Sequence, residues 1–470
     1  MPEQPEHGSG EADAPPPPAP PEFKIRPAAD FVPPEPPPLP EPAEPVLSAD
    51  DELRKLLGTA VPAPERAKPG PSVVAVAARI LLAAALLVPL LGSLLALYWA
   101  ETLLGRCAAA APAIISACAM IAARYGWPWR FRRRRRRALF AMAVAMALVM
   151  AGALVLAAPE GTGGDDGLVV EHVFVVGGFR RHALSNIVPE ADQVAMGIGL
   201  AGWLDPLLGS PKATRVRRLA MPLYESMAGD VAFREMGSVM GRAYAELRGR
   251  PPEAGHYVAV VPRTPMGVAP PAVIFLHGSG GNFSVYWHVL ARLARDHGIA
   301  VVCPSFGCGN WQREGGVAWA LAAADDATAR FRLDPGRMYV AALSNGGRGV
   351  TRLVAARPGR FRGVILISPV LEEAPIARGA EAGAWRGMRV LLFQGARDER
   401  VPMGQVREEY RRIESAGATG TPVIFAEENH FLFFSQRRAV LDRIASWVKV
   451  GEGDEVDWGG DSGYTGPTMR

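Results

Sequence analysis

The sequence predicts an α/β fold with a mostly parallel sheet, preceded by three transmembrane helices and a disordered, proline-rich N-terminal arm. From residue 256 onward, short β-branched runs alternate with helical patterns, which is typical of βαβ units. Ahead of them, residues 72–158 hold three long apolar segments, and residues 1–70 hold about twenty of the 43 prolines. A chain of 470 residues is long enough for one catalytic domain with accessory segments.

Residues 1–70 are predicted to form a disordered arm. Proline runs such as 15–18 and 33–40 cannot form a helix or a sheet ladder, and few apolar residues accompany them. The composition favours a polyproline II spacer, and the alternative is a ligand for an SH3-like partner.

Three apolar segments, residues 80–99, 107–123 and 138–158, are predicted to cross a lipid bilayer. Each is close to the ~20 helical residues that a bilayer core requires. None contains a charged residue, and Trp99 and Trp127 lie near their ends, where aromatic belts form. The alternative is three buried helices of a soluble domain, but the chain offers no polar helix faces to cover them. We therefore expect residues 71–158 to be a membrane anchor.

Eight arginines between Arg124 and Arg137 separate the second and third segments. Arginine-rich short loops stay in the cytoplasm, so this loop and the N-terminal arm are predicted to be cytoplasmic. Three crossings then place the chain after about residue 159 outside the cytoplasm. The eight arginines outweigh the formal net charge of +4, so the rest of the chain does not indicate a nucleic-acid partner.

Residues 159–255 are expected to be a linker and an N-terminal cap or extension, with helical spacing from about 187 to 247 that is interrupted near 209–211. Residues 256–450 are expected to be the catalytic domain. Its strands are predicted at 256–261, 272–276, 300–303, 337–343, 364–368, 390–394 and 423–426. Residues 451–470 are expected to be a loose tail.

Ala342-Leu343-Ser344-Asn345-Gly346 directly follows a predicted strand and matches the strand-to-helix turn that presents a nucleophilic serine. The positions two before and two after the serine must be small, because strand and helix pass close together there. Alanine at 342 departs mildly from the usual glycine, and Gly347 lets the helix begin close to the sheet. Ser344 is the predicted nucleophile.

A glycine-rich loop, His277-Gly278-Ser279-Gly280-Gly281, follows the strand at 272–276. Such a loop can direct backbone N–H groups at a developing alkoxide. We expect an oxyanion hole made by the N–H of Asn345 and that of Ser279 or Gly280. His277 is expected to hold backbone rather than move protons, and Ser279 is the weaker alternative for the nucleophile.

Asp398 follows the strand at 390–394 and is the predicted triad acid, with Glu399 as its competitor. His430 lies in the loop after the strand at 423–426 and is the only histidine after Asp398, which makes it the predicted base. Asp325 and Asp326 precede Ser344 and are expected to be charges on a helix surface. The order Ser–Asp–His is that of α/β-hydrolases.

Over residues 256–450 these motifs resemble those of α/β-hydrolases. Two further matches are Leu333-Asp334-Pro335, ahead of the nucleophile strand, and Val401-Pro402, after Asp398. The nearest resemblance is to serine esterases of the dienelactone-hydrolase and polyhydroxybutyrate-depolymerase type. Serine at 344 departs from the cysteine of dienelactone hydrolases themselves. The resemblance implies hydrolysis of an ester or related acyl bond through an acyl-enzyme.

No cofactor and no metal is expected, because no cluster of His, Cys or Asp has ligand spacing. The expected partners are the lipid bilayer and a small-molecule, lipid or polymer acyl substrate. An acyltransferase or serine peptidase of the same fold and a non-catalytic binding module are the alternatives. Few residues lie between the strands at 364–368 and 390–394, so an open site is expected unless residues 159–255 cover it. Whether Cys303 and Cys308 pair is left open by the sequence.

Overall fold

The computed structural model describes residues 72–125 and 134–450, together with Asp50 and Leu53. The predicted arm at 1–70, apart from those two residues, the centre of the arginine-rich loop and the predicted tail at 451–470 lie outside the described residues. The described residues from 72 to 450 belong to one compact unit.

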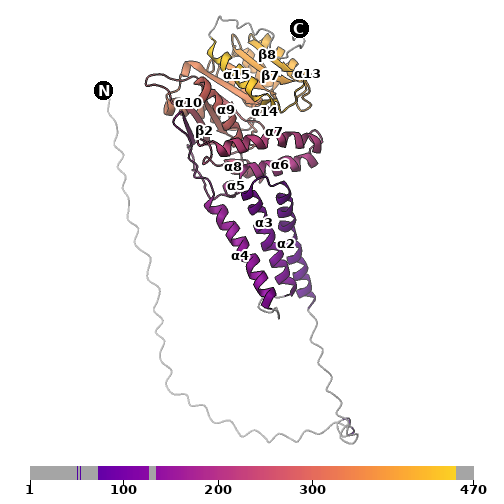
Figure 1. The fold of residues 1–470 in the computed structure, drawn as a ribbon. Helices are drawn as coiled ribbons and strands as arrows, with labels where there is room; N and C mark the ends of the chain where they lie inside the picture. Colours follow the sequence, from indigo (N-terminus) through magenta and orange to yellow (C-terminus); the bar gives the residue numbers. More distant parts are fainter. Residues whose placement is uncertain (1–49, 51–52, 54–71, 126–133, 451–470) are drawn as a thin grey trace, which may run out of the picture. The chain divides into compact units, whose positions relative to one another are not determined.

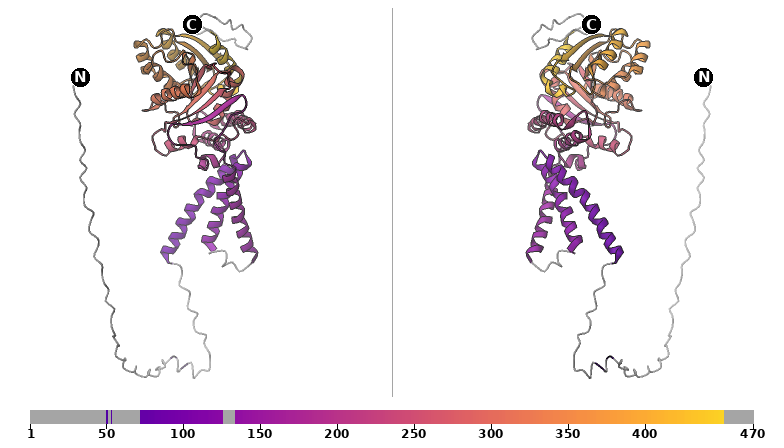
Figure 2. Two further views of the ribbon diagram at one scale, coloured as in Figure 1. Left: turned by 90° about the vertical axis from the view of Figure 1, so that its left-hand side faces the viewer. Right: turned by 90° about the vertical axis from the view of Figure 1, so that its right-hand side faces the viewer.

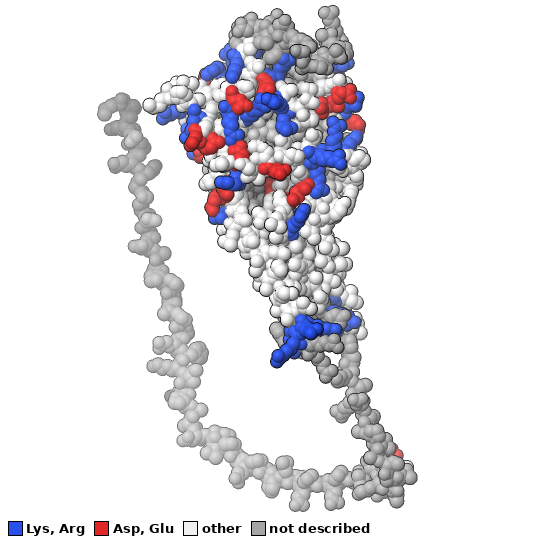
Figure 3. Space-filling model, viewed as in Figure 1, with Lys and Arg blue, Asp and Glu red and all other residues white. Residues whose placement is uncertain are grey.

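Three helices near the N-terminus are long and apolar enough to span a membrane: α2 (Val73–Trp99), α3 (Leu103–Tyr125) and α4 (Arg134–Leu156). Each begins a few residues earlier than the sequence prediction. The helix α3 lies between α2 and α4 (Figure 1). Most side chains of α2 and α4 are exposed, as expected of helices whose apolar surface faces lipid rather than protein. Figure 3 shows their surface as a band without charges, with arginines at one end.

The region 159–255 contains one strand and four helices among its described residues. They are β1 (Leu168–Phe174), α5 (Leu184–Ile187), α6 (Glu190–Leu204), α7 (Gly209–Gly229) and α8 (Met240–Leu247). The break between α6 and α7 is residues 205–208, so it ends just before the interruption predicted near 209–211, and Gly209 and Pro211 lie in the first turn of α7. β1 pairs antiparallel with the first strand of residues 256–450, so this region extends the main sheet instead of standing apart from it.

The main sheet has eight strands in the order β1-β2-β4-β3-β5-β6-β7-β8. β2 is antiparallel to both of its neighbours, and all later pairs are parallel. The strands are β2 (His256–Pro262), β3 (Ala272–Leu276), β4 (Ala300–Ser305), β5 (Met338–Leu343), β6 (Gly363–Ile367), β7 (Arg389–Gly395) and β8 (Thr419–Phe425). The predicted α/β fold with a mostly parallel sheet is confirmed.

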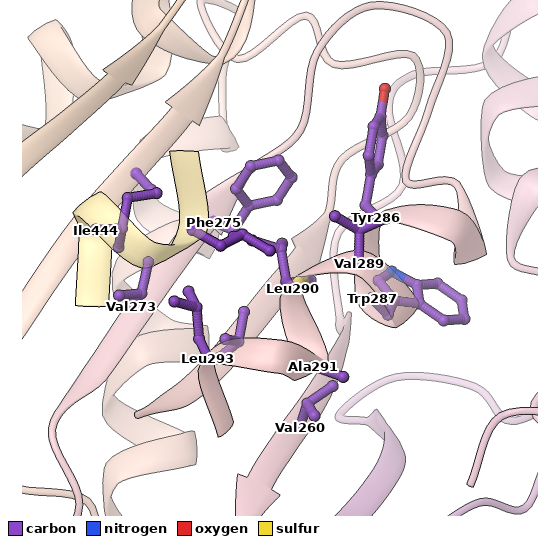
Figure 4. Close-up of a cluster of buried hydrophobic side chains, with 14 of the residues drawn as sticks. Val260, Val273, Phe275, Tyr286, Trp287, Val289, Leu290, Ala291, Leu293 and Ile444 are labelled. Atoms are coloured by element: carbon purple, nitrogen blue, oxygen red, sulfur yellow. The ribbon is translucent and has the colours of Figure 1, made fainter. Parts of the chain in front are cut away.

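Helices cover both faces of this sheet (Figure 2), and so the central strands are apolar on both sides. The helices are α9 (Ser284–His297), α10 (Gly316–Phe331), α11 (Gly346–Ala356), α12 (Glu373–Glu381), α13 (Met403–Ser415), α14 (Leu432–Ser435) and α15 (Arg437–Lys449). On one face, Leu290 and Leu293 of α9 and Ile444 of α15 pack on Val273 and Phe275 of β3 (Figure 4). The other face is covered through a second cluster that includes Trp311 and Trp385.

Long-range contacts tie the apolar helices to the region 159–255. Asp192 of α6 accepts hydrogen bonds from the backbone N–H groups of Glu101 and Thr102, at 2.7 and 3.0 Å, and so caps the start of α3. The rings of Trp99 and Trp203 lie 4.8 Å apart, and Arg217 forms an ion pair with Glu101 at 2.5 Å. The helices α6 and α7 therefore contact the apolar helices. They also contact α9, where Glu190 of α6 accepts a hydrogen bond from Ser284 at 2.7 Å and α7 packs alongside.

Candidate active site

Ser344 occupies the turn between the end of β5 and the start of α11. Its φ of 50° is in the left-handed region, which costs a residue with a side chain about 1–3 kcal/mol. The turn is held by its backbone, because the Ser344 N–H donates to the carbonyl of Ile367 at 2.9 Å and the Ser344 carbonyl accepts from the N–H of Val370 at 2.9 Å. Neighbouring β6 thus holds the strained turn.

The small residues beside Ser344 stand where no larger side chain fits. A Cβ at Gly346 would lie 2.2 Å from the carbonyl oxygen of Leu276, and one at Gly347 would lie 2.6 Å from that of Val370. Ala342 is fully buried in β5, between β3 and β6. The prediction that the residues two before and two after Ser344 must be small therefore agrees with the short distances between backbone segments around the turn.

His430 lies between Ser344 and Asp398. Its Nε2 is 2.9 Å from the Oγ of Ser344, and its Nδ1 is 2.8 Å from Oδ2 of Asp398. A carboxylate can only accept, so Nδ1–H donates to Asp398 and Nε2 is left to accept the hydroxyl proton of Ser344. These three side chains come from loops after β5, β7 and β8, and the structure brings them together.

Asp398 is 4% exposed, and its oxygens are fully used. Oδ1 accepts from the backbone N–H groups of Arg400 and Val401, both at 2.9 Å. Oδ2 accepts from Nε2 of Gln394 at 3.2 Å, in addition to His430. Sequence reasoning missed Gln394, although a polar residue at the end of an otherwise apolar strand was the available signal. These donors hold the carboxylate in one orientation toward the imidazole.

The competing acids lie elsewhere. The side chain of Glu399 is 62% exposed and forms an ion pair with Lys212 at 2.5 Å. Asp325 and Asp326 are on α10, where Asp325 pairs with Arg360 at 2.5 Å. Neither of these interactions involves His430.

The glycine-rich loop after β3 lies against the nucleophile turn. A Cβ at Gly278 would lie 3.4 Å from the Cβ of Ser344, so the loop passes directly beside it. Gly280, at φ 101°, donates its N–H to the carbonyl of Cys308 at 3.0 Å. That N–H is therefore engaged, so of the two predicted loop donors only Ser279 remains a candidate. Gly281 has a φ of 128° and lies against α8, where an added Cβ would be 2.9 Å from the sulfur of Met240.

Asn345 and His277 support these two loops through their side chains. Nδ2 of Asn345 donates to the carbonyl of Gly309 at 2.6 Å. His277 is fully buried, with Nδ1 2.9 Å from the carbonyl oxygen of Gly278 and Nε2 3.3 Å from the N–H of Phe306. Burial lowers the pKa of His277 to about 4, so its imidazole is neutral and holds backbone.

The hairpin of α6 and α7 reaches the loops that carry the triad. Leu208, Ala213 and Val216 form a small apolar cluster that packs against Phe431, the residue after His430. Asp205 forms an ion pair with Arg400, two residues after Asp398. The hairpin of residues 190–229 therefore contacts the loops that hold Asp398 and His430, and sequence reasoning did not foresee which residues of the 159–255 region would do so.

Cys303 and Cys308 are both free thiols in this structure. Cys303 is fully buried in β4, and Sγ of Cys308 lies 3.4 Å from the carbonyl oxygen of Ala243. Within residues 72–125 and 134–450, no group of three His, Cys, Asp or Glu side chains is placed to hold a metal ion.

No family model matches the chain, and no curated protein matches it. Solved structures similar to it are esterases and hydrolases of the α/β-hydrolase superfamily. An S-formylglutathione hydrolase from Staphylococcus aureus is 16% identical, with 41% of this chain and 89% of that chain covered and a TM-score of 0.35. A fluorophosphonate-binding serine hydrolase from the same species is 14% identical, with 42% and 99% covered and a TM-score of 0.37. A phospholipase/carboxylesterase from Dyadobacter fermentans is 20% identical, with 42% and 98% covered and a TM-score of 0.33.

Proposed function

We propose that this protein is a membrane-anchored serine hydrolase that cleaves an ester or related acyl bond through an acyl-enzyme. The observation that carries the proposal is the hydrogen-bonded series from Ser344 through His430 to Asp398, with donor–acceptor distances of 2.9 and 2.8 Å. Ser344 lies in a strained turn, with a φ of 50°, and such a turn presents the serine Oγ above the sheet. A serine that served only as a hydrogen-bonding residue would not need a strained backbone.

In the proposed mechanism, Nε2 of His430 accepts the hydroxyl proton of Ser344 while Oγ attacks the acyl carbonyl. Asp398 stabilises the imidazolium that forms. The N–H groups of Asn345 and Ser279 stabilise the developing oxyanion. His430 then protonates the leaving alcohol, and the acyl-enzyme remains. Water repeats the attack with His430 as base, and the acid product and the free serine are released.

The membrane anchor is proposed from the three long apolar helices, whose mean hydropathies over an 18-residue window are 2.6, 1.6 and 2.6. Arg134–Arg137 lie exposed at the start of α4, and Arg181 of the 159–255 region donates to the carbonyl of Leu156 at its end. If the arginines are cytoplasmic, the hydrolase lies on the opposite side of the membrane.

A fluorophosphonate probe on membranes that contain the full chain tests the chemistry. We expect covalent labelling that is lost in Ser344→Ala and kept in Ser446→Ala, a surface serine of α15 whose Oγ donates to the carbonyl of Asp442. A non-catalytic module predicts no labelling of the unchanged chain. Analysis of products with an added alcohol or amine acceptor separates a hydrolase from an acyltransferase, and peptide substrates test the peptidase alternative.

The membrane arrangement is tested separately in the same preparation. The chain should resist extraction with alkaline carbonate and dissolve only in detergent. Protease added to the cytoplasmic side of sealed vesicles should leave the labelled domain intact. Cleavage of that domain from the cytoplasmic side would contradict the orientation while leaving the chemistry in place.

A further inference from the structure

A second cavity of about 780 Å³ lies in the 159–255 region and contains none of the triad residues. Its walls come from the chain after β1, from α5, from the first half of α6 and from α8. The helix α8 separates it from the oxyanion loop, because Met240 and Ala243 pack on Gly281 while Gly241 and Tyr244 line the cavity. The cavity is therefore distinct from the acyl-binding site beside Ser344.

The cavity has an excess of positive charge. Four arginines line it, namely Arg180, Arg242, Arg248 and Arg250, and the one acidic residue among its lining is Glu253. Arg242 lies 3.9 Å from Glu253 and donates to the carbonyl of Ala254 at 2.8 Å. Burial lowers the pKa of Arg242; the nearby Glu253 opposes this shift, and the nearby Arg180 adds to it. A bound anion would relieve this repulsion, and guanidinium groups bind phosphate oxygens in pairs.

Apolar side chains lie beside these arginines. Phe174 and Phe179 line the cavity, and so do Val176 and Leu184, which are 68% and 75% exposed. A ligand with both an anionic group and a hydrocarbon part would satisfy the two kinds of lining at once. A small hydrated anion would leave the apolar part of the cavity unused.

The cavity also lies next to the end of a candidate membrane span. Arg181 donates to the carbonyls of Ala158 and Leu156, at 3.1 and 3.4 Å, and so joins the cavity wall to the last turn of α4. The end of an apolar helix of that length marks the level of the lipid headgroups. Arg180 and Leu184 are thus placed where a headgroup gives way to acyl chains.

We propose that this cavity binds the headgroup of an anionic phospholipid from the leaflet that faces the hydrolase. The phosphate lies among Arg180, Arg242 and Arg250, and the acyl chains run past Val176 and Leu184. The proposal rests on the membrane-anchored part of the proposed function, and it is independent of the chemistry at Ser344.

The test uses the full chain purified in a zwitterionic detergent. Phosphatidylglycerol, phosphatidylcholine and inorganic phosphate are titrated as probes, and bound lipid is counted by native mass spectrometry. The test variant is Arg180→Gln/Arg250→Gln, which changes two exposed residues of the lining. The matched control is Arg386→Gln/Arg411→Gln, which removes the same charge from exposed positions outside the cavity.

We expect the Kd for phosphatidylglycerol to rise about tenfold or more in the test variant and to change less than about twofold in the control. Phosphatidylcholine should bind the unchanged chain about tenfold more weakly than phosphatidylglycerol. Equal binding of phosphatidylglycerol by both variants, or equal binding of the two lipids, would overturn the proposal. Inorganic phosphate binding as tightly as the lipid would also overturn it, in favour of a soluble anion.

Two readouts keep this result separate from the proposed function. Thermal unfolding of each variant reports that it is folded. Carbonate extraction of the unchanged chain reports on the anchor. Loss of lipid selectivity in a folded, membrane-bound chain therefore contradicts the lipid site alone.

Discussion

Gly346→Ala tests whether the close approach at the nucleophile turn is needed for both stability and catalysis. The added Cβ would lie 2.2 Å from the carbonyl oxygen of Leu276 and 3.2 Å from that of His277. A carbon–oxygen contact needs about 3.3 Å, so the end of β3 and the start of α11 must separate by about 1 Å. Both contacts are with backbone, which cannot rotate away as a side chain can.

The size of the effect follows from two opposing contributions. Forcing a methyl group into a packed site costs about 1–3 kcal/mol or more, and alanine gains at most ~1 kcal/mol over glycine in a helix. A net loss of 2 kcal/mol lowers Tm by about 4–8 °C in a domain of this size. Movement of α11 also displaces the N–H of Asn345. Loss of one oxyanion donor costs about 10²–10³ in kcat.

Thermal unfolding and the rate of fluorophosphonate labelling measure these effects. The matched control is Gly404→Ala in α13, where a Cβ would have no atom within 4 Å. The control should keep its labelling rate and keep or slightly raise its Tm, because only helix propensity changes. If Gly346→Ala unfolds and labels like the unchanged chain, the steric reasoning about this turn is refuted.

Two further predictions follow from the triad and from the buried histidines. Asp398→Asn should slow labelling by about 10⁴, because the imidazole loses the acceptor that fixes its tautomer. Glu399→Gln, which changes a side chain that is 62% exposed, should label at the normal rate. Equal labelling rates for the two variants would contradict the assignment of the acid. Acid should destabilise the fold. Burial lowers the pKa of His172 and of His277 to about 4, whereas the imidazole pKa in the unfolded chain is about 6.5. Between these two pH values the unfolded chain binds more protons than the folded chain, so stability falls as the pH falls. Each of these two histidines should lower the free energy of unfolding by about 1.4 kcal/mol at pH 5.5 relative to pH 8. Urea unfolding at the two pH values measures the sum of the two effects. A free energy of unfolding that does not change with pH would contradict the burial of these imidazoles.

The candidate triad was accessible to sequence reasoning because its signals are local. A serine between small residues after a strand, an aspartate after a later strand and a histidine after the next each follow from backbone geometry within a few residues. The order of the three along the chain then limited the choice. Gln394 and the engagement of the Gly280 N–H were missed, because each depends on a partner that local patterns do not reveal.

The region 159–255 shows the opposite case. Helical spacing indicated that helices are present there, and the break at Gly209 lies where α7 begins. Nothing local indicated that Lys212 would pair with Glu399, which is 187 positions away, or that Asp192 would cap α3 from 91 positions away. Charged residues on amphipathic helices have many possible partners, and no pattern in one sequence selects among them.

The sequence alone determined the class of fold, the apolar segments and the identity of the three candidate catalytic side chains, because steric size, periodicity and hydrophobicity act over short stretches of chain. Tertiary structure decided the rest. It set the distances from His430 to Ser344 and Asp398, placed α6 and α7 against the loops of Asp398 and His430, and gathered four arginines around one cavity. These features arise from contacts between distant segments, whose geometry exists only once the sheet and its covering helices have packed.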